Sequence, residues 1–250
     1  KNKDITLDKV KKLIEISKKY GNSTGFCFYG GEPFCAYSLL EEIIEYCKSQ
    51  KDHTFSYKMN SNGSLFTEEK IKYLTENNVE ICLSHDGLMQ DDCRLTKDKK
   101  GTFSLLSEKI DILLHYQPDS VALVTVDPSC VEKLSESVKY LFKKGFKNVA
   151  ITPRYAEICP WDDDSFSVLS DEFEKLSEIY VEKTLNGDDF TLASFDVKIR
   201  DYITGGKRVG KGCRLGEKQV CIMPDGKIYP CQQFIEDEYF MGDVYSGIIK

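Results

Sequence analysis

The stretch Phe28-Tyr29-Gly30-Gly31-Glu32-Pro33-Phe34 ends a short apolar run and precedes a helical pattern that starts near Tyr37. The apolar run, residues 25–29, is typical of a buried strand. Two adjacent glycines at the carboxyl end of a strand let the backbone come within hydrogen-bonding distance of a bound group. Parallel α/β sheets and barrels bind their ligands at that end of the strands. We therefore expect a small polar ligand at Gly30 and Gly31.

Helical and strand-like patterns alternate from the start of the chain to about residue 153. The first helix is expected from about Leu7 to Tyr20, after Thr6 as its N-cap and before Gly21 as its stop. No strand precedes this helix, so a strand is expected upstream of Lys1. Apolar strands that alternate with helices predict a parallel sheet with right-handed crossovers. The expected strands are 25–29, 54–59, 79–84, 121–126 and 147–152, and the expected helices lie near 38–50, 67–77, 103–116 and 131–144.

The fold class that follows is α/β, a partial barrel of six β/α units that resembles a TIM barrel without its first strand. Beyond Pro153 the pattern changes to a loop at 159–164, a long helix at 170–185 and a shorter helix at about 195–204. Short segments at 219–223 and 227–229 then flank Pro224-Asp225-Gly226, which predicts a hairpin. We divide the chain into a partial-barrel core at 1–155, a helical connection that completes the barrel at 156–210, and the start of a cysteine-rich hairpin domain at 211–250.

Charge and hydropathy limit the classes of partner. The chain has 250 residues and a net charge of -7, which argues against nucleic acid because phosphate binding requires a basic surface. The two basic runs, at 97–100 and 207–211, are short and are interpreted as solvated loops. No apolar stretch reaches the roughly 20 residues that span a bilayer, and no signal peptide is present. We expect a cytoplasmic protein without a membrane partner, and a chain that is truncated at both ends.

Ten cysteines are many for a chain of this size, and without a secretory signal they are interpreted as reduced thiols or metal ligands. Cys213, Cys221 and Cys231 surround the hairpin signal at Asp225-Gly226. Thiolates bind iron–sulfur clusters or zinc, and three of them leave a four-ligand site one short. The alternative is a set of partly exposed thiols without a metal. Cys27, Cys47 and Cys82 fall on apolar faces and are interpreted as buried small hydrophobes.

Polar residues follow the second and third expected strands, as Ser61-Asn62-Gly63 and Ser84-His85-Asp86-Gly87, with Arg94 shortly after. Each motif alone is compatible with an ordinary turn or a surface arginine. In a barrel, however, these loops meet at one face. A zwitterionic ligand needs acceptors for its ammonium group, which the Gly31 backbone and Glu32 can supply. It also needs a hydroxyl or guanidinium for its carboxylate, which Ser84 and Arg94 can supply.

The motifs at 28–33, 61–63, 84–87, 92–94 and 101–103 resemble, in that order, the core of radical S-adenosylmethionine enzymes. The segment from Cys213 to Cys231, with its continuation through 229–234 and 241–244, resembles the start of the SPASM extension. That extension is typical of anaerobic sulfatase-maturating enzymes and of maturases of ribosomal peptides.

The resemblance implies two kinds of cofactor, S-adenosylmethionine and [4Fe–4S] clusters. It implies that Gly30, Gly31 and Glu32 hold the methionyl ammonium and that Ser84 and Arg94 contact the carboxylate and ribose side. It further implies that Cys213, Cys221 and Cys231 ligate the first auxiliary cluster. The Cys-x-x-x-Cys-x-x-Cys loop of the cofactor-cleaving cluster would precede the first helix and is absent from the sequence. We therefore assign no catalytic residue and expect the segment alone to be inactive.

By the same resemblance, the intact protein would oxidise or cross-link a residue of a peptide or protein and would take electrons from a donor such as flavodoxin or ferredoxin. Sulfatase-maturating enzymes carry an aspartate after the cysteine that matches Cys231, whereas this chain has Gln232, which cannot act as a base. The pattern is closer to thioether-forming peptide maturases, with sulfatase maturation as the alternative. Two other hypotheses remain, a non-catalytic homologue that binds a peptide or small ligand and a zinc-stabilised barrel.

Overall fold

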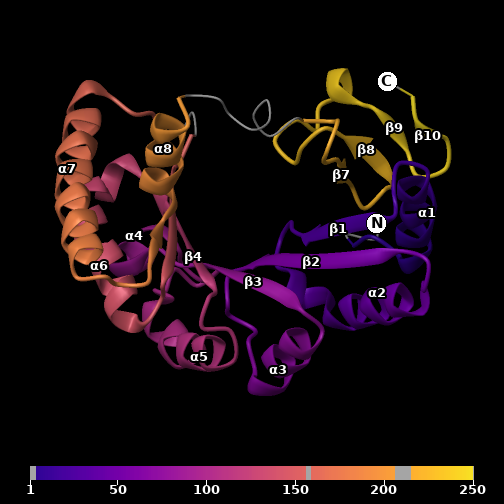
Figure 1. Cartoon of the computed structure of the whole chain (residues 1–250), viewed down its shortest axis with the longest axis horizontal. Coiled ribbons are helices and arrows are strands. Elements are labelled where there is room, and N and C mark those ends of the chain that lie inside the picture. Colours follow the sequence, from indigo (N-terminus) through magenta and orange to yellow (C-terminus); the bar gives the residue numbers. More distant parts are fainter. Residues whose placement is uncertain (1–3, 156–158, 206–214, 250) are drawn as a thin grey trace. The chain divides into compact units, whose positions relative to one another are not determined.

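The computed structural model describes residues 4–155, 159–205 and 215–249 (Figure 1). The chain forms two compact units. The core unit consists of residues 27–34 and 58–200, and the terminal unit of residues 1–26, 35–57 and 201–250. Strands β1 and β2 each contain residues that belong to both units.

The main sheet has six strands in the order β1-β2-β3-β4-β5-β6, which is also their order in the chain. The pairs β3–β4, β4–β5 and β5–β6 are parallel, as the β/α alternation predicted. The strands are β1 Ser23–Phe28, β2 Thr54–Ser61, β3 Val79–Ser84, β4 Val121–Val126, β5 Asn148–Pro153 and β6 Thr191–Leu192. The predicted α/β fold is confirmed.

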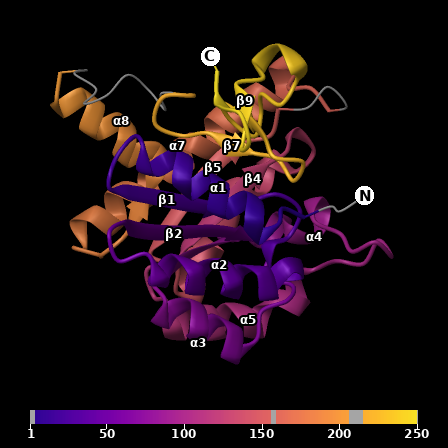
Figure 2. The ribbon, with the colours of Figure 1, turned by 90° about the vertical axis from the view of Figure 1, so that its right-hand side faces the viewer.

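Helices connect consecutive strands and cover the sheet. In the core unit, α3 lies beside α5 (Figures 1 and 2) and next to β3, and α6 packs on α7 (Figure 1). The helices are α1 Leu7–Lys18, α2 Tyr37–Ser49, α3 Glu68–Glu76, α4 Gln90–Cys93, α5 Phe103–Tyr116, α6 Leu134–Lys144, α7 Asp163–Leu185 and α8 Ala193–Ile203, with short 3-10 turns η1 Pro33–Ala36, η2 Gly87–Met89, η3 Pro128–Lys133 and η4 Asp237–Tyr239.

The core lies between the sheet and these helices because alternate strand residues point to them. Ala122, Val124 and Val126 of β4 are at most 1 % exposed, whereas the residues between them are half-buried. Ile71 and Leu74 of α3 are fully buried as well. Each buried Val, Ile or Leu of this set contributes about 1.5–3 kcal/mol through removal of apolar surface from water.

Helix α7 corrects the sequence prediction at 159–170. Residues 162–164 were assigned to a loop and the helix to 170–185, but α7 begins at Asp163. The cause is a reciprocal cap: the Asp162 carboxylate accepts from the Ser165 amide at 2.8 Å, and the Asp162 amide donates to Ser165 Oγ at 2.9 Å. A capping box of this kind satisfies amides that would otherwise be unpaired in the first turn.

A second sheet of four short strands lies in the terminal unit, in the order β10-β9-β8-β7. The predicted hairpin around 224–226 is confirmed, since β7 and β8 pair antiparallel. Lys9 of α1 donates to the Pro224 carbonyl at 2.6 Å, which ties the first helix to the hairpin turn. The strands are β7 Cys221–Ile222, β8 Lys227–Tyr229, β9 Gly242–Asp243 and β10 Gly247–Ile248.

Several short elements were not predicted from the sequence. These are η1, η2, η4, α4, β6, β9 and β10, each of four residues or fewer. Strand β6 is the sixth strand of the sheet and was not predicted, whereas the strand expected upstream of Lys1 stays a prediction. Elements this short carry too few residues for a recognisable period.

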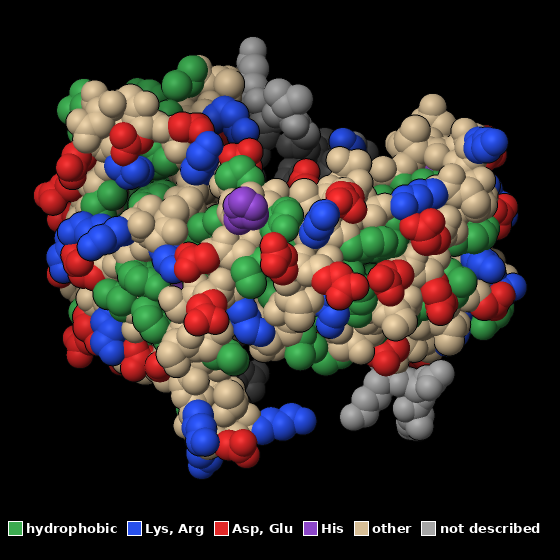
Figure 3. Space-filling view, turned by 90° about the horizontal axis from the view of Figure 1, so that it is seen from below, with side chains coloured by type: hydrophobic (Ala, Val, Ile, Leu, Met, Phe, Trp, Pro, Cys, Tyr) green, Lys and Arg blue, Asp and Glu red, His purple; other side chains and the backbone are tan. Residues whose placement is uncertain are grey.

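The surface mixes charges of both signs. Acidic and basic side chains alternate over the face in Figure 3. In the described ranges, no helix combines the length and the hydropathy that a membrane crossing requires.

Gly87 offers a test of the packing between η2 and α6. Its φ is +63°, and a Cβ there would lie 2.6 Å from both the Cβ and the carbonyl oxygen of Ser137. We expect Gly87→Ala to lower the free energy of unfolding by about 3 kcal/mol, from backbone strain plus overpacking. Gly187→Ala is the matched control, because its φ is +73° but its Cβ would meet nothing within 4 Å. The control should cost about 1 kcal/mol. Equal losses in urea unfolding would contradict the packing argument.

Candidate functional site

Two adjacent glycines, Gly30 and Gly31, lie shortly after β1, and we call them the glycine shelf. Gly30 and Gly31 have φ values of +93° and +48°, a region that residues with a side chain rarely occupy. A Cβ built on either glycine would meet nothing within 4 Å. These glycines are therefore required by the backbone path, and the space beside them is open to a ligand.

The Glu32 carboxylate links the end of β1 to the end of β2. Oε1 accepts from Ser61 Oγ at 2.7 Å and from the Phe34 amide at 3.2 Å, and Oε2 accepts from the Asn62 amide at 2.8 Å. A carboxylate offers about four lone-pair sites. Glu32 therefore fixes the shelf on the neighbouring strand and keeps acceptor capacity for a further donor.

The Asp86 carboxylate links the end of β3 to β4, and it also binds the Arg94 guanidinium. Arg94 Nε and Nη2 donate to the two Asp86 oxygens at 2.5 and 3.0 Å, and the Thr125 amide donates to Asp86 Oδ1 at 2.8 Å. Asp86 is 1 % exposed and the Arg94 side chain 29 %. A guanidinium that donates to one carboxylate through two of its nitrogens is held in a fixed plane. The third nitrogen of Arg94, Nη1, has no hydrogen-bond partner in the described part of the chain.

Ser84 is the last residue of β3, in register with Leu123 of β4. Among the described residues, its hydroxyl has no hydrogen bond to protein and it is half-buried. The five predicted cofactor-binding residues (Gly30, Gly31, Glu32, Ser84 and Arg94) thus all belong to the core unit, in or after β1 and β3. Their contact with a ligand stays a prediction.

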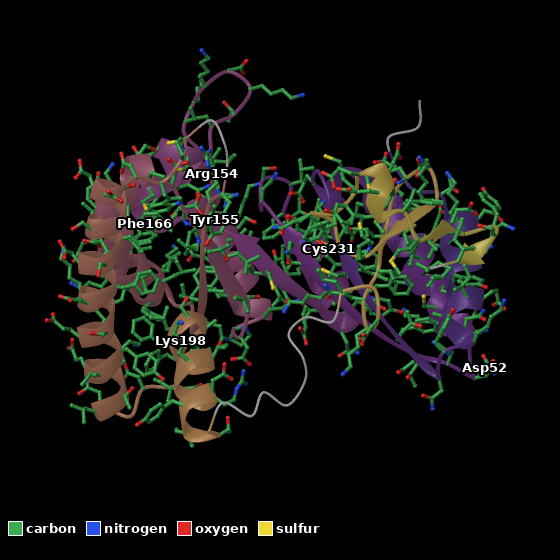
Figure 4. All side chains as sticks on the ribbon, turned by 90° about the horizontal axis from the view of Figure 1, so that it is seen from above. Asp52, Arg154, Tyr155, Phe166, Lys198 and Cys231 are labelled. Carbon is green, nitrogen blue, oxygen red and sulfur yellow. The ribbon has the colours of Figure 1, made fainter. Side chains whose placement is uncertain are left out.

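Sequence reasoning missed a third carboxylate of this kind. Asp127 follows β4, and its Oδ2 lies 2.8 Å from Nε of Arg154, which follows β5 (Figure 4). Burial alone would raise the pKa of Asp127, but hydrogen bonds from Ser129 and the charge of Arg154 outweigh it, so this pKa is lowered. Asp127 directly follows the predicted strand 121–126 and Arg154 lies two residues after the predicted strand 147–152, so the rule that singled out 61–63 and 84–87 would also have found them.

His85 is fully buried and packs against the rings of Phe103 and Tyr140, which also contact each other. Its Nδ1 accepts from the Gly87 amide at 3.0 Å, while Nε2 has no partner in the described part of the chain. Burial, with a smaller contribution from Arg94, lowers the pKa of His85 to about 4. The ring is therefore neutral at pH 7.

The predicted metal ligands lie in the terminal unit, apart from Cys213, which falls outside the described residues. Cys221 in β7 pairs with Tyr229 in β8, and Cys231 lies two residues after Tyr229 (Figure 4). Both thiols are free and half-buried. Burial raises the pKa of Cys221, and the proximity of Cys231 adds to this. In the described ranges no three His, Cys, Asp or Glu side chains come together as a metal site. Two thiols near one hairpin are compatible with an iron–sulfur cluster whose remaining ligands come from other parts of the protein.

Parallel strands carry a glycine shelf, paired carboxylates and an oriented arginine at their carboxyl ends, which defines an α/β protein with polar groups gathered at this edge. Residues 1–153, more than half of the chain, match the radical SAM superfamily. The chain therefore belongs to the radical SAM superfamily, whose members use S-adenosylmethionine and iron–sulfur clusters.

Individual proteins resemble the chain over most of its length. A cysteine-type anaerobic sulfatase-maturating enzyme of Clostridium novyi is 26 % identical over 230 residues, which cover 87 % of this chain and 61 % of that enzyme. The structure of anSMEcpe with bound AdoMet and Kp18Cys peptide matches with a TM-score of 0.80 at 21 % identity, over 96 % of this chain and 69 % of that one. The structure of Streptococcus suis SuiB bound to precursor peptide SuiA matches with a TM-score of 0.58 at 15 % identity, over 90 % of this chain and 52 % of that one. The chain thus spans about three fifths of the length of its curated relative.

His85 makes stability depend on pH. The unfolded chain binds a proton at His85 below its ordinary pKa of 6.5, whereas the folded chain does so only below about 4. The free energy of unfolding should therefore fall as the pH drops from 6.5 to 4, by up to about 3 kcal/mol, and stay level with respect to this group below 4. His85→Asn keeps an acceptor for the Gly87 amide and should flatten this part of the profile. The matched control, His115→Asn at an exposed position of α5, should leave it unchanged. A wild-type slope that persists in His85→Asn would contradict the assignment.

Proposed function

We propose that the carboxyl edge of β1 to β3 holds S-adenosylmethionine, and that the intact protein is a radical enzyme that modifies a residue of a peptide or protein substrate. The observation that carries the proposal is the arrangement at this edge: an open glycine shelf fixed by Glu32, and an arginine oriented by Asp86. When bound next to a reduced [4Fe–4S] cluster, S-adenosylmethionine supplies an adenosyl radical that removes a hydrogen atom from the substrate.

In this proposal the residues of the chain bind and orient the cofactor. The backbone at Gly31 and the remaining acceptor capacity of Glu32 receive the methionyl ammonium, because no Cβ obstructs the shelf. The Ser84 hydroxyl and Nη1 of Arg94 donate to the carboxylate and ribose side. Asp86 acts through Arg94, since its two oxygens determine the plane of the guanidinium.

Cys221 and Cys231, together with Cys213, would ligate an auxiliary [4Fe–4S] cluster in the terminal unit. Membership of the radical SAM superfamily favours iron–sulfur ligation over zinc. Two free thiols near one hairpin support this assignment.

The substrate class has two candidates. The curated relatives include sulfatase-maturating enzymes, and one similar solved structure, that of anSMEcpe, contains a Kp18Cys peptide, which supports a protein or peptide substrate. Position 232, however, is a glutamine whose Oε1 lies 3.3 Å from Cys231 Sγ. An amide cannot take up a proton as a carboxylate does. This favours a thioether-forming reaction, which needs no base at that position in our proposal, over sulfatase maturation.

Arg94 provides the test of the cofactor site. In the full-length protein with its clusters intact, Arg94→Ala should weaken S-adenosylmethionine binding about 10- to 100-fold, the equivalent of one charge-assisted hydrogen bond. Lys175→Ala is the matched control, because it also removes a cation from a buried carboxylate, Glu172, at 2.6 Å. Equilibrium dialysis should show unchanged binding in the control. Equal binding by wild type and Arg94→Ala, in folded protein, would overturn the assignment.

Gln232 provides the test of the substrate class. Under reducing, anaerobic conditions the full-length wild type should remove two hydrogen atoms from a cysteine-rich precursor peptide as a thioether forms, and should convert a sulfatase-derived cysteine peptide slowly. Gln232→Asp should raise the rate with the sulfatase peptide, because it restores a proton acceptor. Mass spectrometry of both peptides measures the outcome. Rapid conversion of the sulfatase peptide by wild type would favour sulfatase maturation instead.

A further inference from the structure

Two thiols face each other next to Arg94. Cys93 is the last residue of α4, Cys130 lies in η3, and their sulfur atoms are 3.2 Å apart. Both segments lie in the core unit and follow the carboxyl ends of neighbouring parallel strands, β3 and β4. The pair was not singled out by sequence, because 36 residues separate the two cysteines and neither has ligand-like spacing.

Packing alone does not account for this pair. Cys130 is 2 % exposed, but Cys93 is exposed at the surface, so Cys93 is not a small hydrophobe that fills a core. Among the nine cysteines in the described ranges, no other two thiols are hydrogen-bonded to each other. One sulfur is thus reachable from solvent and the other is within reach of the first.

The surroundings shift the pKa values of the two thiols in opposite directions. The hydrogen bond between them, followed by burial, raises the pKa of Cys93. The same hydrogen bond lowers the pKa of Cys130 against the opposing effect of burial. Either sulfur can donate in this hydrogen bond, so the two thiols share one proton position between them. Two sulfurs in contact, one of them on an exposed residue, allow an attack on an external disulfide to be followed by closure of an internal one.

We propose that Cys93 and Cys130 are a redox-active dithiol, a modification site that a low-molecular-weight disulfide such as oxidised glutathione converts into an intramolecular disulfide. The exposed Cys93 loses its proton to solvent, and its thiolate attacks the glutathione disulfide and releases one glutathione thiolate, which takes up a proton. Cys130 then attacks Cys93 in the mixed disulfide and releases the second. Two protein thiols are oxidised and one external disulfide is reduced to two thiols. The sulfurs must approach by about 1 Å to reach the bond length of about 2.0 Å.

The bond would join α4 to η3 and so restrict the segment that carries Arg94. Arg94 follows Cys93 directly, and its amide donates to the Gln90 carbonyl at 2.8 Å. Cross-linking therefore fixes the backbone on the amino side of the residue that Asp86 orients. This inference does not depend on which ligand Arg94 binds.

The test is disulfide mapping on full-length protein prepared without oxygen. The protein is treated with oxidised glutathione, quenched with acid and an alkylating agent, digested without reduction and examined by mass spectrometry. We expect a peptide pair joined at Cys93 and Cys130, which dithiothreitol separates. Cys93→Ser should abolish the link, and Cys130→Ser should stop at a stable glutathione adduct on Cys93. Cys159→Ser is the matched control, because its thiol lies 3.7 Å from Asp127 Oδ1 in the same region and should not be needed.

Hydrogen exchange provides a second measurement. Amides of residues 90–95 should exchange several-fold more slowly after oxidation and return to the initial rate after reduction, with no such change in Cys93→Ser. The proposal is overturned if wild type shows no link between 93 and 130 under conditions in which exposed Cys35 acquires a glutathione adduct. It is equally overturned if Cys93 or Cys130 links to Cys159 instead.

Discussion

A carboxylate that is removed from water must be hydrogen-bonded or paired with a cation, and this constraint shapes the carboxyl edge of the parallel sheet. Glu32 follows β1 and accepts from the end of β2. Asp86 follows β3 and accepts from the β4 backbone and Arg94. Asp127 follows β4 and pairs with Arg154 after β5. Each acid satisfies its oxygens on the next strand along the sheet, so the loops that carry the candidate site are tied together in pairs.

The same pairing determines what the edge can present to a ligand. Because the acids are occupied, the groups that remain available are the open backbone at Gly30 and Gly31, the Ser84 hydroxyl and one nitrogen of Arg94. These groups are neutral or cationic, apart from the spare acceptor capacity of Glu32. That combination suits a zwitterion with one ammonium and one carboxylate. The dithiol of Cys93 and Cys130 lies beside the arginine, where oxidation would act on the orientation of the same side chain.

Much of the fold follows from local patterns. Strands β3 and β4 and helix α5 have the predicted bounds, because their apolar periods are long and their ends are marked by turn residues. The start of α7 could not be placed, since the cap at Asp162 depends on a side-chain geometry that Ser165 completes. Strand β6 has two residues and exists only because it pairs with β5. Its pairing partner is remote in sequence, so no local signal identifies it.

The sequence by itself determined the α/β alternation, the hairpin at 224–226, the resemblance to radical S-adenosylmethionine enzymes and the residue types of the candidate site. These depend on hydrophobic period, turn chemistry and ordered motifs, all of which are local. Only the tertiary structure decided that Asp86 holds Arg94, that Asp127 pairs with Arg154 and that Cys93 meets Cys130. These contacts join loops that follow different strands, and their geometry is set by the parallel register of the sheet, which brings together residues that are far apart in the chain.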